Sequence, residues 1–131
     1  MRYLLDTSVF LWVLTGQDKL NPRAQEILTT SLSELHFSAV GAWEIAIKCA
    51  LGALRLPKPP REFVLYALRS WPMQALTITQ EHALRAGELP MHHRDPFDRM
   101  LIAQALEEEM TLLTADHMFQ KYKVNLIFCG K

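Results

Sequence analysis

The sequence predicts an α/β fold, a three-layer α/β/α sandwich around a central parallel sheet of four or five short strands. One observation is that short apolar runs alternate with longer segments of helical pattern along the chain. Another is that these runs are apolar at nearly every position, which is typical of strands covered on both faces by helices. The third is size, because 131 residues of which 50% are hydrophobic suit one domain. We therefore expect a single domain over residues 1–131.

Five apolar runs predict the strands. They share a length of four or five residues and a high content of leucine, isoleucine and aromatic side chains. They are RYLLD (2–6), LHFS (35–38), ALTIT (75–79), TLLTA (111–115) and NLIFC (125–129). Because helical patterns separate most of them, their connections favour parallel pairing.

The segments between the first runs predict helices with recognisable starts and stops. One helix follows the first run and continues to about Leu14. The next begins with Asn21 as N-cap and with Pro22 in the first position, where a missing N–H does no harm. After the second run, a Ser38 cap starts a helix that stops near Gly52.

The later helices are separated by proline-rich and polar loops. LPKPP (56–60) predicts a connector, because proline breaks regular structure, and LPMHHR (89–94) predicts a loop. The predicted helices are REFVLYALRSW (61–71), a short segment ending near Glu88, and residues 95–110.

Composition limits the cellular compartment and the classes of binding partner that we expect. Fourteen lysine and arginine residues balance 14 aspartate and glutamate residues, so an RNA or DNA partner would have to bind through a local patch. The cysteines, Cys49 and Cys129, have no metal-type spacing and are too few for a disulfide framework, and we expect Cys49 in the core. The apolar stretch near the start is interrupted by Asp6 and is shorter than the roughly 20 residues of a membrane span. We expect a soluble, cytoplasmic protein without a membrane partner.

Carboxylates gather at the predicted carboxyl ends of the strands. Asp6 ends the first run and Asp116 follows the fourth, while Glu44 and Asp98 lie on helices that approach the same edge. Ligands of open parallel sheets bind beyond this edge, so we expect the four side chains to converge. Converging carboxylates repel one another unless a cation neutralises them, and oxygen-rich sites suit Mg²⁺ or Mn²⁺.

Each carboxylate also has a purely structural explanation. The alternatives are an N-cap for Asp6, an i,i+4 ion pair with Lys48 for Glu44, and the cap of a short turn for Asp116. Asp95, Pro96 and Asp98 fit an N-cap, a proline at N1 and an acidic N3. Capping explains Asp95 better than Asp98, because aspartate at N3 reaches back less well than glutamate or glutamine.

His92 and His93 form a histidine pair in a polar loop. Such a pair suggests zinc, but no cysteine or second histidine pair stands at ligand spacing. A solvated loop or a phosphate contact is therefore the favoured interpretation.

Four stretches together resemble the PIN-domain family, and within it the VapC-type toxins of bacterial type II toxin–antitoxin pairs. They are LLDTSVFLW, FSAVGAWEIAIK, HHRDPFDRMLIAQA and LLTAD followed by a phenylalanine three positions after its aspartate. The resemblance covers essentially the whole chain, in the family's order. It implies a metal-dependent ribonuclease with a parallel sheet flanked by helices.

The resemblance assigns roles position by position. It implies an acidic, metal-binding catalytic set of Asp6, Glu44, Asp98 and Asp116. Asp95 belongs to the DPFD variant of the motif, and the small hydroxyls expected to support the site are Thr7 or Ser8 and Thr114. Possible contacts to the substrate backbone are Arg94, Arg99, His92 and His93, although Arg99 could equally pair with a nearby carboxylate.

The implied activity is hydrolysis of RNA phosphodiesters by a water activated by Mg²⁺ or Mn²⁺, leaving 5′-phosphate and 3′-hydroxyl ends. The resemblance also implies a cognate antitoxin and a homodimer. Trp12, Trp43 and Trp71 offer apolar contact surface for the antitoxin, although we expect Trp43 to be core.

Two other functions remain open. One is another Mg²⁺-dependent phosphoryl-transfer enzyme, such as a phosphatase of the haloacid-dehalogenase type. That class needs a second aspartate two residues after the first-strand aspartate, where this chain has Ser8. The other is a PIN-like binding module that cleaves nothing.

Overall fold

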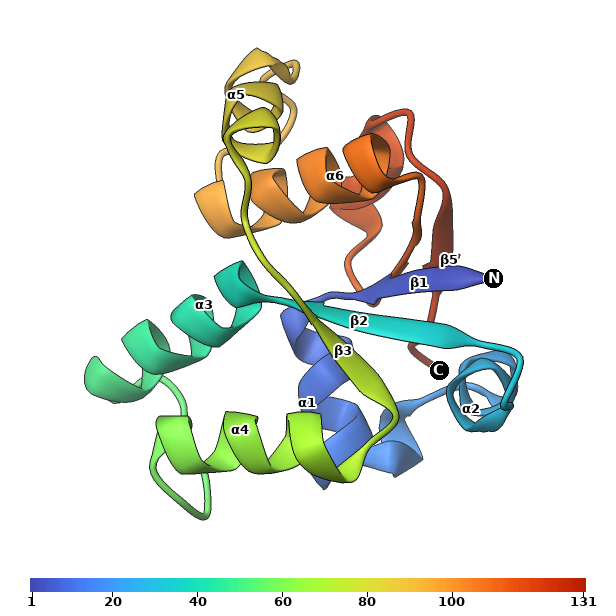
Figure 1. Cartoon of the computed structure of the whole chain (residues 1–131), viewed down its shortest axis with the longest axis vertical. Coiled ribbons are helices and arrows are strands. Elements are labelled where there is room, and N and C mark those ends of the chain that lie inside the picture. The colour runs from blue at the N-terminus through green and yellow to red at the C-terminus, as the bar shows by residue number, and fades with distance from the viewer.

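A five-stranded, all-parallel sheet lies at the centre of the computed structural model, which describes residues 1–131 (Figure 1). The strands are β1 (Arg2–Leu5), β2 (Glu34–Ser38), β3 (Met73–Leu76), β4 (Thr111–Thr114) and β5 (Leu126–Phe128). Their order across the sheet is β3-β2-β1-β4-β5. The predicted α/β fold with a parallel central sheet is confirmed.

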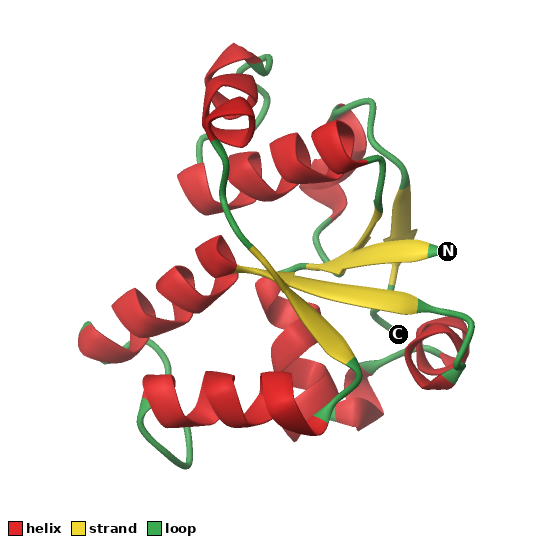
Figure 2. Cartoon of the chain, viewed as in Figure 1, coloured by secondary structure: helices red, strands yellow, loops and turns green.

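Helices cover both faces of this sheet (Figure 2). The α-helices are α1 (Thr7–Thr15), α2 (Pro22–Thr29), α3 (Ala39–Ala50), α4 (Pro60–Ser70), α5 (Gln80–Glu88) and α6 (Pro96–Glu108). Two short 3-10 helices, η1 (Gln17–Lys19) and η2 (His117–Lys121), complete the structure. None of these helices has both the length and the apolarity needed to span a bilayer.

The core has two parts, one on each face of the sheet. Leu5 and Phe37 belong to a cluster that joins the sheet to α1, α2 and α4. Leu4 and Leu112 belong to a second cluster that joins it to α6 and η2. Successive residues of β1 thus point into different clusters, which explains why the strand is apolar at consecutive positions.

The predicted helix starts are confirmed at atomic detail. The Asn21 side chain accepts a hydrogen bond from the Ala24 backbone N–H at 2.8 Å, and Ser38 accepts one from Val40 at 3.0 Å. Gly52, just beyond α3, has a φ of 75°, a conformation that glycine adopts without strain. Local capping chemistry therefore sets both ends of α3.

Two element boundaries differ from the prediction. The third strand was expected at 75–79, but the paired residues are Met73–Leu76. The cause is Thr79, whose hydroxyl accepts from the His82 N–H at 3.2 Å while its own N–H donates to His82 Nδ1 at 3.0 Å. This capping box commits Thr79 to α5. Pro60 likewise begins α4 instead of remaining in the connector.

Two expected core residues are not core. Trp43 is 60% exposed, because the face of α3 that packs inward carries Val40, Glu44 and Ile45. The Trp43 ring lies edge-on to Phe97, with the ring centroids 5.2 Å apart. Cys49 is only half-buried, whereas Cys129 is fully buried.

Candidate metal centre

The strand order places a ligand-binding edge between β1 and β4. From β1 the chain builds β2 and β3 on one side, and then β4 and β5 on the other. The strand order therefore reverses between β1 and β4, and ligands of open parallel sheets bind beyond the carboxyl ends of strands at such a point. Asp6 directly follows β1, and Asp116 lies two residues after β4.

Asp6 is both a helix cap and a member of this edge. Its Oδ1 accepts from the Val9 N–H at 2.8 Å, which caps α1, and its Oδ2 accepts from the Thr114 hydroxyl at 2.5 Å. Burial raises the pKa of Asp6 to about 6, against these hydrogen bonds, and the charge of Glu44 adds to the rise. Capping therefore does not compete with a role at the sheet edge, because each oxygen has its own partner.

Glu44 is buried on the inner face of α3. Its Oε1 accepts from the Thr7 hydroxyl and its Oε2 from Lys48 Nζ, both at 2.6 Å. The ion pair with Lys48 is thus present, but the carboxylate itself is 6% exposed and is not a surface group. The bond to Glu44 raises the pKa of Lys48, and the charges of Asp95 and Asp98 also favour its protonated form.

Asp95 and Asp98 have different roles in the structure. Asp95 caps α6 by accepting from the backbone N–H groups of Phe97 at 2.9 Å and Asp98 at 3.4 Å. The Asp98 carboxylate makes no capping bond and instead meets His93 Nε2 at 2.8 Å through Oδ2. Burial, together with the charges of Asp95 and Glu44, raises the pKa of Asp98 well above its usual range.

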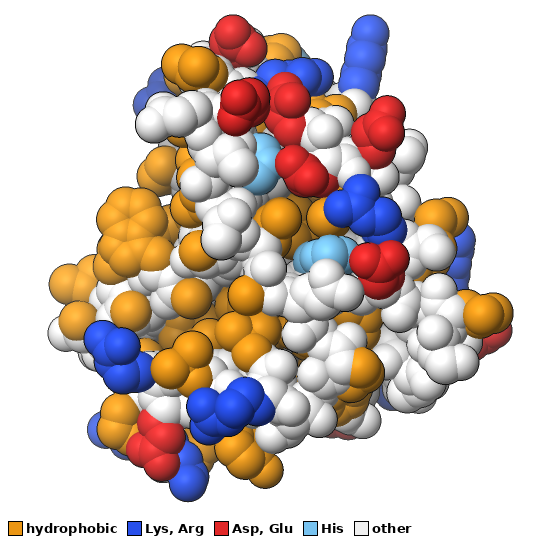
Figure 3. Space-filling view, in the orientation of Figure 1, with side chains coloured by type: hydrophobic (Ala, Val, Ile, Leu, Met, Phe, Trp, Pro, Cys, Tyr) orange, Lys and Arg blue, Asp and Glu red, His pale blue; other side chains and the backbone are white.

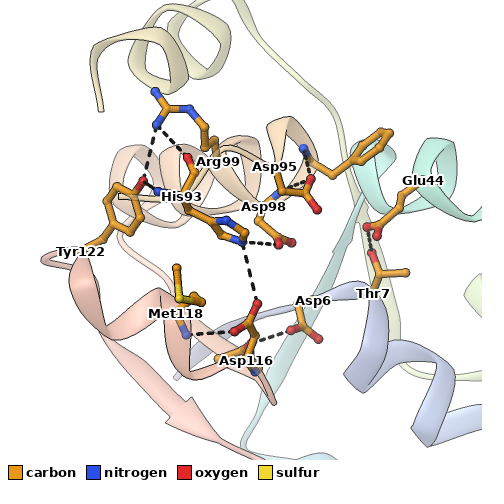
Figure 4. A network of polar contacts seen from close by, with 12 residues as sticks. Asp6, Thr7, Glu44, His93, Asp95, Asp98, Arg99, Asp116, Met118 and Tyr122 are labelled. Carbon is orange, nitrogen blue, oxygen red and sulfur yellow. Dashed lines mark hydrogen bonds and ion pairs between the residues drawn. The ribbon is translucent and has the colours of Figure 1, made fainter. Parts of the chain in front are cut away.

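His93 joins this group from the loop before α6. Its Nε2 lies 2.8 Å from Asp98 Oδ2 and 3.8 Å from Asp116 Oδ2 (Figure 4). Ligand atoms of these three side chains all lie within 4.8 Å of one another. The expected solvated loop holds for His92, which is exposed, but not for His93, whose side chain is 18% exposed.

Asp116 also uses one oxygen locally. Its Oδ1 accepts from the Met118 N–H at 2.9 Å and so caps η2, as the structural alternative expected. Its backbone N–H donates to the Thr114 hydroxyl at 3.0 Å. Thr114 therefore connects Asp6 to Asp116, and its predicted supporting position is matched by its contacts.

Other sequence-selected residues lie outside the group or act differently. Arg99 is buried, and its guanidinium pairs with no carboxylate. Its hydrogen-bond acceptors are the carbonyls of Ala86, Leu89, Pro90 and His93 and the hydroxyl of Tyr122. Thr7 supports Glu44, whereas Ser8 is exposed and its side chain makes no hydrogen bond. Arg94 is exposed.

The sequence matches the family profile described as PIN domain over residues 3–125. The chain belongs to the PIN domain family. A comparison with curated proteins found no significant match.

Solved structures share the fold of this PIN domain across its length. A chain of the VapBC2 structure from Rickettsia felis, bound to a promoter DNA fragment, is 14% identical with a TM-score of 0.73, over 98% of this chain and 99% of that one. DNA-bound VapBC from Salmonella typhimurium gives 16% identity and a TM-score of 0.69, over 98% of both chains. FitAcB from Neisseria gonorrhoeae gives 20% identity and a TM-score of 0.66, over 95% of this chain and 96% of that one.

The donor set of this PIN domain fits a hard divalent cation. Asp6, Glu44, Asp98 and Asp116 supply carboxylate oxygens, and Lys48 is the only lysine or arginine that pairs with any of them. The raised pKa values of Asp6 and Asp98 mark negative charge that burial and neighbouring carboxylates leave poorly compensated. A cation such as Mg²⁺ or Mn²⁺ would relieve that repulsion.

Proposed function

We propose that this PIN domain is a metal-dependent endoribonuclease, the toxin of a type II toxin–antitoxin pair. The observation that carries the proposal is the convergence of Asp98 and Asp116 with His93, beside the buried Asp6, at the point where the strand order reverses. Membership of the PIN family, with structural neighbours that are VapBC and FitAB complexes, supports the same function.

The acidic residues would hold the metal, and their neighbours fix their positions. Asp98 and Asp116 would bind it directly, with Asp6 and Glu44 binding directly or through water. Bound Mg²⁺ or Mn²⁺ would neutralise phosphate charge and lower the pKa of an attacking water. Thr114 orients Asp6, while Thr7 and Lys48 orient Glu44.

A cavity beside Asp116 supports a single-stranded RNA substrate. It has a volume of about 420 Å³, and its walls include Ala115 and His117, the two chain neighbours of Asp116. Aromatic side chains and lysines contribute most of the remaining wall, namely Trp12, Phe128, Lys19 and Lys131. His117 and Phe128 stack with ring centroids 4.4 Å apart. Aromatic faces bind unpaired bases, and lysines bind the phosphates between them.

An apolar surface between α3 and α4 supports a protein partner. Trp43 and Leu65 are exposed there and line a cavity of about 300 Å³ together with Pro60 and Val64. An antitoxin segment with apolar side chains fits this surface, which we name the α3–α4 groove. The homodimer implied by the family resemblance stays a prediction, as do the single-domain organisation and the cytoplasmic location.

Cleavage of single-stranded RNA by the purified chain tests the proposed activity. We expect cleavage with Mg²⁺ or Mn²⁺ and none in EDTA. Asp98→Asn and Asp6→Asn should each lower the rate by at least about a hundredfold, because each removes charge that the metal requires. Glu62→Gln, at an exposed carboxylate on α4, should cleave like the wild type. Full metal-dependent cleavage by both aspartate variants would show that the assignment is wrong.

The same assay separates the two other functions. A phosphatase would release phosphate from a phosphomonoester and leave RNA intact, and the exposed Ser8 provides no second aspartate for that chemistry. A binding module would bind metal and RNA without any cleavage. Metal titration followed by the RNA-cleavage assay therefore assigns the chain to one of the three classes.

A further inference from the structure

We propose that His93 is a nitrogen ligand of the bound metal ion, so that the site selects Mn²⁺ and Co²⁺ over Mg²⁺. The proposal rests on the metal site of the proposed function and adds one ligand to it. It concerns the imidazole itself, whereas the site expected from the sequence is made of carboxylates alone.

The position of the ring is the first observation. His93 Nε2 lies between two carboxylates from different elements, at 2.8 Å from Asp98 on α6 and 3.8 Å from Asp116 after β4 (Figure 4). The three ligand atoms lie within 4.8 Å of one another. Two atoms on opposite sides of one ion would be about 4.2 Å apart, since metal–ligand distances are about 2.1 Å. The three side chains thus need only small movements to share an ion.

A buried clamp holds His93 in this position, and it is the second observation. The His93 N–H donates to the Tyr122 hydroxyl oxygen at 2.8 Å, and the His93 carbonyl accepts from Arg99 at 3.3 Å. The Tyr122 hydroxyl in turn donates to the Pro90 carbonyl at 2.9 Å. Arg99 and Tyr122 are both buried, so the loop that carries His93 is anchored to the interior of the protein. Preorganisation of this kind is what a ligand on a loop requires.

The neighbouring histidine supplies a natural comparison. His92 is exposed, and its ring lies edge-on to Tyr122 with the centroids 5.2 Å apart. It belongs to the same loop but makes no contact with a carboxylate. The clamp therefore directs one imidazole of the pair into the acidic group and leaves the other in solvent.

Imidazole nitrogen changes which metal is preferred. Mg²⁺ prefers oxygen ligands, whereas nitrogen ligands increase affinity for transition metals in the order Mn²⁺ below Co²⁺. Replacing the imidazole by an amide should therefore weaken Co²⁺ and Mn²⁺ binding much more than Mg²⁺ binding. Arg99 and Tyr122 are positioning residues in this scheme, because they act only through the loop.

The test is metal binding to the RNA-free protein. Electron spin echo envelope modulation of the Mn²⁺-loaded wild type should show coupling to an imidazole ¹⁴N. Titration calorimetry should show that His93→Gln weakens Co²⁺ and Mn²⁺ binding on the order of tenfold or more, with a much smaller effect on Mg²⁺. His93→Gln should lose the ¹⁴N coupling, and the matched control His92→Gln should retain both coupling and affinity.

The outcomes separate this proposal from the proposed function. Mn²⁺ that binds in an Asp98-dependent manner but shows no ¹⁴N coupling in the wild type would overturn the His93 ligand and leave the acidic site standing. Coupling that persists in His93→Gln would overturn it as well. Mn²⁺ binding that is absent, or that Asp98→Asn does not weaken, would overturn the metal site itself. If His93→Gln fails to fold, loss of the coupling in His93→Ala, with the coupling retained in His92→Gln, assigns it to His93.

Discussion

The charge of Asp6 has opposite effects on stability and on the proposed metal site. It destabilises the metal-free fold, and the metal site requires it. Its Oδ1 caps α1 and its Oδ2 accepts from Thr114, so both oxygens have hydrogen-bond donors. Its burial nevertheless raises the pKa to about 6, so the folded chain binds the Asp6 proton more tightly than the unfolded chain does. Without a metal, the ionised carboxylate therefore opposes folding at neutral pH.

The first prediction concerns how the destabilisation of the folded state by ionised Asp6 depends on pH. Because the pKa rises from 3.8 to about 6 on folding, stability due to Asp6 is present below about pH 4 and is lost as the pH rises to about 6. The loss corresponds to roughly 3 kcal/mol. Asp6→Asn keeps a cap acceptor and removes the charge, so in EDTA it should be more stable than the wild type at pH 8, with a difference that vanishes near pH 4.

Urea unfolding at several pH values measures this difference. Added Mn²⁺ should stabilise the wild type and not Asp6→Asn, because a ligand stabilises only the form that binds it. Equal free energies of unfolding at pH 8 in EDTA would contradict the prediction.

Some of the site could be predicted residue by residue and some could not. The separate roles of Asp95 and Asp98 follow from local capping chemistry, which depends on residues within one turn. The role of Arg99 could not be predicted, because its acceptors are carbonyls of residues 86–93, which no sequence pattern marks. The position of His93 depends on Tyr122, 29 residues away in the chain.

At the scale of elements, α3 packs unusually close to its neighbouring strand. A Cβ at Gly41 would lie 2.5 Å from Cζ of Phe37. That ring cannot move freely, because Phe37 is fully buried and stacks on Phe10 with centroids 3.7 Å apart. Glu44 lies about one turn further along the same helix.

The second prediction is that Gly41→Ala destabilises the protein. Helix propensity alone would favour alanine by about 1 kcal/mol, but overpacking costs about 1–3 kcal/mol. We expect a net loss of about 1 kcal/mol in thermal or urea unfolding. Gly87→Ala on α5 is the matched control, because a Cβ there meets nothing within 4 Å. It should stabilise the protein slightly, and equal effects of the two variants would contradict the packing argument.

Elements with caps were predictable and edge elements were less so. Asn21 and Ser38 begin their helices at the predicted residues. The third strand was misplaced because Ile78 and Thr79 have strand-like side chains, yet Thr79 is committed to the capping box of α5. The Trp43 error has a similar cause, since helical periodicity does not say which face of α3 packs inward when Ala42, Trp43 and Ile45 are all apolar.

At the scale of the whole molecule, apolar side chains gather on one side, over α3 and toward α4 (Figure 3). Trp43 is 60% exposed and Leu65 is 46% exposed. Exposed apolar surface of this kind marks protein interfaces when it surrounds a concave site. The α3–α4 groove shares α3 with Glu44, although Glu44 lies on the buried inner face of that helix.

The third prediction is that this groove binds the cognate antitoxin of the proposed toxin–antitoxin pair. Trp43→Ala and Leu65→Ala should each weaken binding of that antitoxin by about tenfold or more, as loss of a buried interface side chain does. RNA cleavage without the antitoxin should be unchanged for Leu65→Ala. Leu84→Ala, at an exposed leucine on α5 outside the groove, is the control. Unchanged antitoxin affinity in both groove variants would place the interface elsewhere.

The pairing of β1 with β4 has a consequence for the time at which the protein can act. Tyr3 of β1 pairs with Thr111 of β4, so the sheet can be joined across its centre only after β4 has been synthesised. Asp6 and Glu44 come from the early part of the chain, and Asp98 and Asp116 from the late part. A nascent or truncated chain that ends before β4 holds Asp6, Glu44 and Asp98 but lacks Thr114 and Asp116. At translation rates of about 5–20 residues per second, the acidic group would stay incomplete until β4 and Asp116 have been synthesised. The proposed RNA-cleavage activity would therefore be absent from a nascent chain that has not reached Asp116.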